Sequence, residues 1–195
     1  ITGTLSGSYN SAEIAKKIYL EEYPDTKIHV IDSLSAGGEV DLIVRKLNHL
    51  VAEGLDFDQV VDGITAYQAK TKLLFVLAKV DNLVKNGRLS KLVGTVVGLL
   101  NIRMVGEASK TGTLELLQKA RGQKKAIKAA FDELLKAGYA GGHITIAHRN
   151  NEKFIEQFSE LVREKFAQAS IEVLPTSGLC SFYAEEGGLL MGYEI

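Results

Sequence analysis

The stretch ITGTLSGSYNSAEIAKKIYLEEY, residues 1–23, decides the fold of this chain. Its first twelve residues hold five serine and threonine side chains and two glycines, and residues 11–23 then place apolar side chains at the spacing of one helical face. Three interpretations compete for the opening loop: a disordered leader, a loop that cradles phosphate, or a junction between a preceding strand and a helix. The residues that follow decide between them.

The next elements predict half of an α/β layer. The segment KIHVIDS at 27–33 predicts a short strand, and residues 35–54 and 57–71 predict two helices, the second starting near Asp56 or Asp58. A helix, a strand and two helices need further strands to form a sheet. We therefore expect those strands upstream of Ile1, which the absence of an initial methionine also suggests.

A second pattern begins near Leu73 and predicts a mixed sheet with helices. Its elements are a strand at 73–78, helical turns at 80–102 broken by Asn86–Gly87, two strands within 103–117, helices at 120–138 and 150–168, and strands at 143–150, 171–178 and 187–195. We expect a domain boundary near residue 71, with domains at 1–70 and 71–195.

Composition excludes several classes of protein. The chain has 46% hydrophobic and 24% charged residues, as a folded soluble protein does, and 23 basic against 24 acidic residues leave a net charge of −1. This balance gives no chain-wide footprint for nucleic acid. The longest apolar run, 92–100, is too short for membrane insertion, and no signal peptide opens the chain. These two features predict a cytoplasmic location. The single cysteine, Cys180, cannot form an internal disulfide and predicts a buried structural thiol.

The opening loop is a candidate anion site. Ser6 and Ser8 stand beside glycines directly before a helix, where exposed amides and the helix dipole favour a carboxylate or phosphate. Ordinary capping of the helix by Ser8, Asn10 or Ser11 explains the same residues equally well. No lysine follows the glycines, so the loop is not a nucleotide P-loop.

Other candidate residues also have two interpretations. Arg88, in KNGRLSK, can fix a carboxylate through its two-pronged guanidinium or be a solvated charge. Tyr183 can offer a hydroxyl at a pocket mouth or fill a core. The basic cluster Arg121, Lys124 and Lys125 can bind phosphate or a protein, or simply be a solvated helix face.

No catalytic or metal-binding set emerges from the sequence. His143 and His148 lie five residues apart on a predicted strand, so they face opposite sides and do not share a metal. Paired cysteines and a serine–histidine–aspartate order are likewise missing from the pattern.

Five motifs together resemble the DegV family: LSGSYNSA at 5–12, VIDS at 30–33, NGRLSK at 86–91, KARGQKKAI at 119–127, and the glycine-rich C-terminus. The resemblance implies a two-domain α/β protein, here with a truncated three-layer α/β first domain and an α+β second domain. It implies a carrier without catalytic residues, cofactor or metal. Such a protein holds one long-chain fatty acid between its domains and presents the carboxylate to a separate fatty acid kinase, which makes the acyl phosphate.

The resemblance also assigns roles to individual residues. Ser6 corresponds to the serine that bonds the fatty-acid carboxylate, and Ser8 replaces a common threonine. Arg88 corresponds to an arginine near the carboxylate or at the kinase-facing surface, and Tyr183 stands where many members carry histidine. We further expect Arg121, Lys124 and Lys125 to serve partner docking. The small-residue helix at 92–100 is our candidate for the wall of the acyl tunnel, through Val93, Gly94, Val97, Gly98 and Leu100.

Two other functions remain open at this point. A small-molecule phosphotransferase or hydrolase would use the hydroxyl-rich loop and Arg88, and would turn over substrate without a partner. A protein-interaction module would use the basic cluster and bind no lipid.

Overall fold

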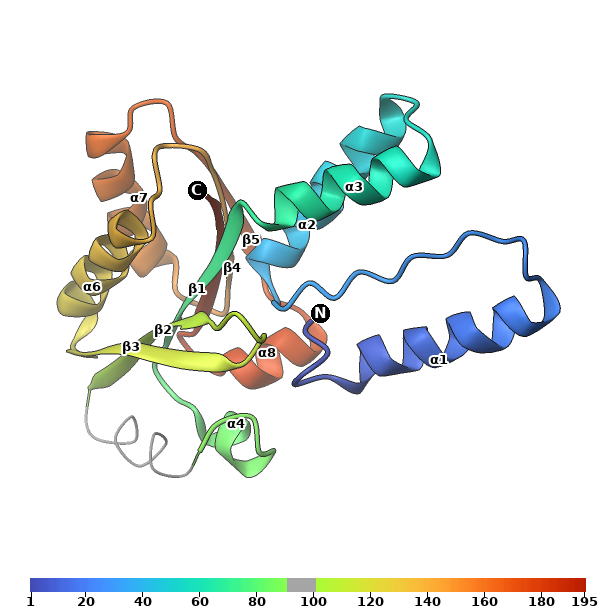
Figure 1. Cartoon of the computed structure of the whole chain (residues 1–195). Helices are drawn as coiled ribbons and strands as arrows, with labels where there is room; N and C mark the ends of the chain where they lie inside the picture. Colours follow the sequence, from blue (N-terminus) through green and yellow to red (C-terminus); the bar gives the residue numbers. More distant parts are fainter. Residues whose placement is uncertain (91–100) are drawn as a thin grey trace.

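The computed structural model describes residues 1–90 and 101–195, and its centre is a six-stranded mixed sheet (Figure 1). The strand order is β3-β2-β1-β6-β4-β5. The strands are β1 (Thr71–Leu77), β2 (Ile102–Ala108), β3 (Leu114–Arg121), β4 (His143–His148), β5 (Ser170–Pro175) and β6 (Leu189–Glu194). Among the strands of the described residues, only β4 and β5 pair in parallel, because helix α7 (Glu152–Lys165) connects them as a crossover. The α/β class and the mixed sheet are confirmed.

Two faces of the sheet carry different layers. On one face, α6 (Gln123–Lys136) and α7 pack over alternate residues of β1, Leu74 and Val76. The intervening residues, Phe75 and Leu77, point to the other face, where they pack with α4 (Asp81–Lys85) and α8 (Gly178–Ala184). Because both faces are covered, β1 is a continuous apolar run rather than an alternating one.

Helix α2 (Gly38–Ala52) lies against the same face as α4 and α8, over β6, β4 and β1. The approach is close enough to require glycine on both sides. A Cβ at Gly38 would overlap the backbone carbonyl of Thr145, and a Cβ at Gly192 would overlap the backbone of Glu39. These two glycines fix the distance between helix and sheet.

Residues 1–70 contain three helices and irregular backbone but no strand. Helix α3 (Phe57–Gln68) packs on α2 through Ile43, Leu50 and Ile64, and begins at the predicted cap Asp56, which forms a capping box with Gln59. Helix α1 (Gly7–Glu22) buries no residue and extends away from the sheet in Figure 1.

The predicted strand at 27–33 is wrong for the described structure. Residues 27–33 run as irregular backbone and no strand of the described residues pairs with them. A strand exists only when a neighbour completes its hydrogen bonds, and the sequence pattern alone does not supply one.

Two helix starts and one additional helix also differ from what the sequence predicts. Helix α1 starts at Gly7 and is capped by Ser6, not by Ser8, Asn10 or Ser11. The helix expected from residue 120 starts at Gln123, because β3 continues to Arg121 and Gly122, with φ of 84°, ends it. Helix α8, within the glycine-rich C-terminal stretch, was not expected. The predicted tunnel helix at 92–100 lies outside the described residues.

Candidate functional site

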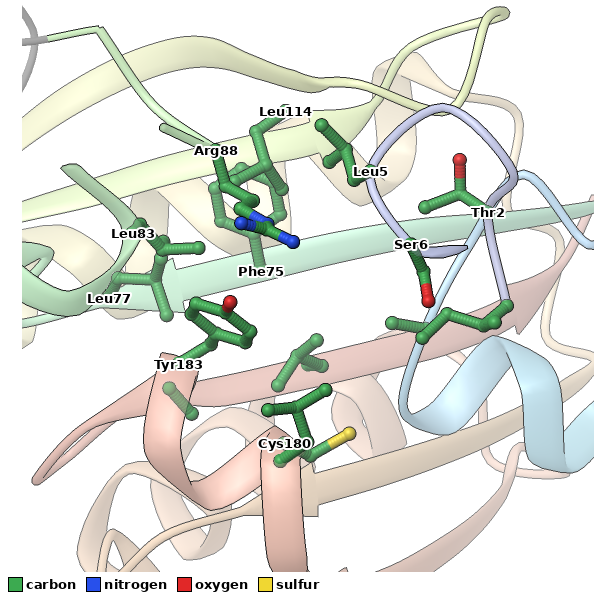
Figure 2. A pocket seen from close by; sticks show the side chains of 15 residues that line it. Thr2, Leu5, Ser6, Phe75, Leu77, Leu83, Arg88, Leu114, Cys180 and Tyr183 are labelled. Carbon is green, nitrogen blue, oxygen red and sulfur yellow. The ribbon is translucent and has the colours of Figure 1, made fainter. Parts of the chain in front are cut away.

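An apolar pocket lies on the face of the sheet that carries α4 and α8 (Figure 2). Its empty volume is about 790 Å³, including the open mouth. The opening loop, the strands β1, β3 and β6, and the helices α4 and α8 contribute its lining residues. These are Ile1, Thr2, Leu5, Ser6, Ala36, Phe75, Leu77, Leu83, Arg88, Leu114, Leu179, Cys180, Tyr183, Ala184 and Leu190.

The floor of the pocket is built by the centre of the sheet. Phe75 is 1% exposed and lies opposite Gly106 of β2 and Leu190 of β6. A Cβ at Gly106 would lie 2.7 Å from Phe75 Cε2, so the glycine makes room for the aromatic ring. A register shift at Val105/Gly106 accompanies this packing. The floor is therefore apolar and suited to a hydrocarbon rather than a polar ligand.

The polar groups of the pocket are few. Figure 2 shows Arg88 and Tyr183 on one side and Ser6 on the other, with the guanidinium of Arg88 directed into the space between them. These three predicted residues come from distant parts of the sequence, and the fold brings them to one pocket. Their binding roles stay predictions.

Ser6 combines the two interpretations of the opening loop. Its Oγ accepts a hydrogen bond from the Ser8 amide at 3.2 Å, which caps α1, and it also lines the pocket. Ser8 is exposed and does not line the pocket, although its hydroxyl accepts from Ser6 Oγ at 3.2 Å. The N-terminus of α1, with its positive end of the helix dipole, therefore starts at the pocket wall.

Arg88 is held by the turn that follows α4. Gly87, with φ of 72°, makes the turn, and the Arg88 amide donates to Leu83 O at 2.8 Å. Its Nη1 donates to Asn86 O at 2.6 Å, and its Cζ lies 5.7 Å from the ring centroid of Tyr183. Because none of the ion pairs found in residues 1–90 and 101–195 involves Arg88, its charge is available to an anion.

Helix α8 contributes two side chains, Cys180 and Tyr183, to the pocket wall. Cys180 is half-buried at the pocket wall, so the prediction that this thiol is buried is wrong. Tyr183 lies one helical turn further and is also half-buried. Two further lining residues, Leu5 of the opening loop and Leu114 of β3, were not predicted from the sequence. The spacing of Cys180 and Tyr183 was the available signal, since residues three apart share a helical face.

The basic cluster is not part of this pocket. Arg121, Lys124 and Lys125 are exposed at the end of β3 and the start of α6, and α6 covers the opposite face of the sheet. Its predicted docking role stays a prediction.

The histidines do not form a shared site. His143 Nδ1 lies 3.0 Å from Ser170 Oγ, whereas His148 Nδ1 accepts from the Asn151 amide at 3.2 Å. In the part of the chain that the structure describes, no group of three or more histidine, cysteine or acidic side chains could hold a metal ion. Nor is any helix of that part long and apolar enough to cross a membrane.

A second, polar cavity lies between α2 and the β2–β3 hairpin and contains a buried carboxyl. Glu39 is 5% exposed and accepts a hydrogen bond from Thr71 Oγ1 at 2.8 Å. Burial raises the pKa of Glu39 above its ordinary value, and the bond from Thr71 opposes this only in part.

Comparison with known proteins gives close relatives. The family model described as "Uncharacterised protein, DegV family" matches residues 1–193. A DegV domain-containing protein of Streptococcus pneumoniae is 78% identical over 195 residues, all of this chain and 69% of that protein. One of Streptococcus pyogenes serotype M1 is 67% identical over the same residues, 70% of its length.

Solved structures agree in fold. The Fatty Acid Kinase B3 protein of S. pneumoniae, loaded with linoleic acid, is 78% identical with a TM-score of 0.97, and the match covers 100% of this chain and 69% of that one. A DegV family protein from Eubacterium eligens, loaded with heptadecanoic acid, is 39% identical with a TM-score of 0.94, over 100% and 70% of the two chains. The chain described here belongs to the DegV family.

Proposed function

We propose that this chain binds one long-chain fatty acid, with the hydrocarbon in the apolar pocket and the carboxylate beside Ser6, Arg88 and Tyr183. The single observation that carries the proposal is the pocket itself, which joins an apolar floor to Arg88, an arginine without an ion pair among residues 1–90 and 101–195. Relatives of the same fold are loaded with linoleic and heptadecanoic acids, so the ligand class agrees with the site chemistry.

Burial of the acyl chain is sufficient to drive binding. Each CH₂ group removed from water contributes about 0.8 kcal/mol, so a chain of about sixteen carbons gains roughly 12 kcal/mol before the costs of association. The polar groups then orient the ligand more than they hold it. We therefore expect a few polar contacts to recognise the head group, and the apolar surface buried by the acyl chain to supply most of the binding free energy.

We infer that the partner of this carrier is a fatty acid kinase. A relative that is 78% identical is described as the B3 protein of such a kinase. In this scheme the kinase phosphorylates the carboxylate with ATP in the cytoplasm, and the carrier supplies no catalytic group, cofactor or metal. The exposed cations Arg121, Lys124 and Lys125 would meet an acidic surface of the kinase.

The proposal keeps the division at residues 1–70 and 71–195. It is supported by the distribution of elements, because the strands of the described residues all belong to the second part. The pocket would then lie where the two parts meet, with Ser6 and Ala36 from the first. Val93, Gly94, Val97, Gly98 and Leu100 remain our candidates for the tunnel wall.

Mass spectrometry of organic extracts from the purified chain tests the proposal. We expect a C16–C18 fatty acid, either co-purified or taken up in a ratio of about one per chain when it is offered. No bound or acquired fatty acid would overturn the carrier function. Turnover of a phosphorylated or ester substrate by the chain alone would favour an enzyme instead.

A further inference from the structure

The segment that carries Ser6 to the pocket is tied down from two sides. Residues 1–6 form no helix or strand, yet Thr2 is 6% exposed and lines the pocket. The Thr2 amide donates to Ser35 O at 2.9 Å, and Thr2 Oγ1 donates to Gly112 O at 2.8 Å. One residue therefore joins the 32–36 loop to the tip of the β2–β3 hairpin.

Asp32, in the 32–36 loop, holds the same segment through its side chain. Its Oδ1 accepts from the Gly3 amide at 2.9 Å and from the Leu34 amide at 3.0 Å. Leu34 has φ of 52°, a conformation that a leucine rarely adopts, so the second bond stabilises a strained loop. Gln68 Nε2 adds a bond to Asp32 O at 2.7 Å and so ties the loop to α3.

The hairpin tip is shaped to receive Thr2. Gly112 has φ of 76°, and a Cβ there would overlap Thr2 Oγ1 and lie 3.2 Å from Leu34 Cα. Thr4 Oγ1 adds a second contact, a bond of 2.5 Å to Thr111 O. Glycine at this position thus permits the approach of loop and hairpin.

These contacts end at Ser6. The Ser6 amide donates to Thr2 O at 3.1 Å, and Ser6 Oγ caps α1. Any shift of Thr2 therefore moves both the hydroxyl and the first amides of α1 relative to Arg88 across the pocket. Asp32 does not line the pocket, so it acts on the ligand only through the loop.

We propose that Thr2, Asp32 and Gly112 form a clamp that positions Ser6 against the ligand carboxylate, and that the clamp sets the preference for a free acid over its ester. This inference rests on the proposed function. Asp32 and Gly112 are positioning residues, and the sequence segment VIDS at 30–33 owes its aspartate to this role. The choice between acid and ester then depends on Gly112 at the tip of the β2–β3 hairpin, which does not itself contact the carboxylate.

The test compares palmitoleic acid with its methyl ester, both delivered from cyclodextrin, for binding to the wild-type chain and four variants. Thr2→Val removes the hydroxyl at nearly constant shape, Thr2→Ser keeps it, and Asp32→Ala removes the acceptor of two amides. Thr65→Val is the control, because it deletes a similar 2.7 Å bond to Val61 O on exposed α3.

We expect Thr2→Val and Asp32→Ala to bind the acid roughly tenfold more weakly and the ester within about twofold of the wild type, since one hydrogen bond to a charged group is misplaced. Thr2→Ser and Thr65→Val should keep the wild-type ratio. A purely structural role would weaken both ligands equally, and that result overturns the clamp, as does an unchanged ratio in both Thr2→Val and Asp32→Ala. A wild-type chain that binds neither ligand refutes the proposed function first.

Discussion

Arg88 gives the sharpest test of the proposed site, because it is the one cation that lines the pocket in the described part of the chain. Replacement by glutamine removes the charge and the planar fork but keeps a polar side chain of similar reach. We expect Arg88→Gln to bind long-chain fatty acids much more weakly and to bind their methyl esters about as well as the wild type. The physical reason is the loss of the charge partner of the carboxylate.

The magnitude follows from the surroundings of the guanidinium. A fully exposed ion pair contributes about 0.2–1 kcal/mol, whereas a hydrogen bond to a charged group away from water contributes about 1.5–3 kcal/mol. Arg88 is half-buried beside Tyr183, and its bond to Asn86 O restrains the fork before ligand arrives. The second range therefore applies, and it corresponds to a loss of affinity of roughly ten- to a hundredfold.

Displacement of a fluorescent fatty acid, or calorimetric titration, measures this loss. Arg121→Gln is the matched control, since it makes the same change of charge at an exposed position outside the pocket. The affinity of Arg88→Lys for the acid should lie between those of Arg88→Gln and Arg121→Gln, because lysine keeps the charge but not the two-pronged geometry. An Arg88→Gln chain that binds the acid within about twofold of the Arg121→Gln control would refute the assignment of Arg88 to the carboxylate.

Three further predictions concern the packing, a buried carboxyl and the pocket wall. Gly192→Ala should lower the free energy of unfolding by roughly 1–3 kcal/mol in urea titration, because the new Cβ would overlap the backbone of Glu39. Gly7→Ala should not lower it, because a Cβ at Gly7 has no neighbouring atom within 4 Å. Equal stability of the two variants would contradict the close packing of α2. Because burial raises the pKa of Glu39, the contribution of this carboxyl to stability is fully present below its ordinary pKa near 4.5 and is lost as the pH rises through the raised value. The melting temperature of the Glu39→Gln variant should therefore fall less than that of the wild type from pH 4.5 upward. An equal fall in both chains would count against this effect of burial. Alkylation of Cys180 should slow in proportion to occupancy as fatty acid is added, and a rate indifferent to ligand would remove Cys180 from the pocket wall.

Local patterns in the sequence determined the class of the fold. The apolar run at 73–78 gave the central strand β1, since a strand covered on both faces needs no alternation. Helical periodicity located α2, α3 and α7 within a few residues, and Asp56 marked the start of α3 through its capping chemistry. These features depend on neighbours in sequence, which is why the sequence reveals them.

The sequence also predicts which side chains could bind a carboxylate. Ser6, Arg88 and Tyr183 were identified from residue type, local setting and a family resemblance. Nothing in their spacing showed that they share one pocket, and nothing showed that the basic cluster from Arg121 to Lys125 lies on the other face of the sheet.

Only the tertiary structure decided how these segments meet. Pairing of β1 with both β2 and β6 brings the turn after α4, the helix α8 and the opening loop to the same face. The same dependence on partners explains why residues 27–33, with a strand-like pattern, form none among the described residues. Periodicity reports which face of an element is apolar, but strand pairing and close glycine contacts between distant segments decide what that face meets.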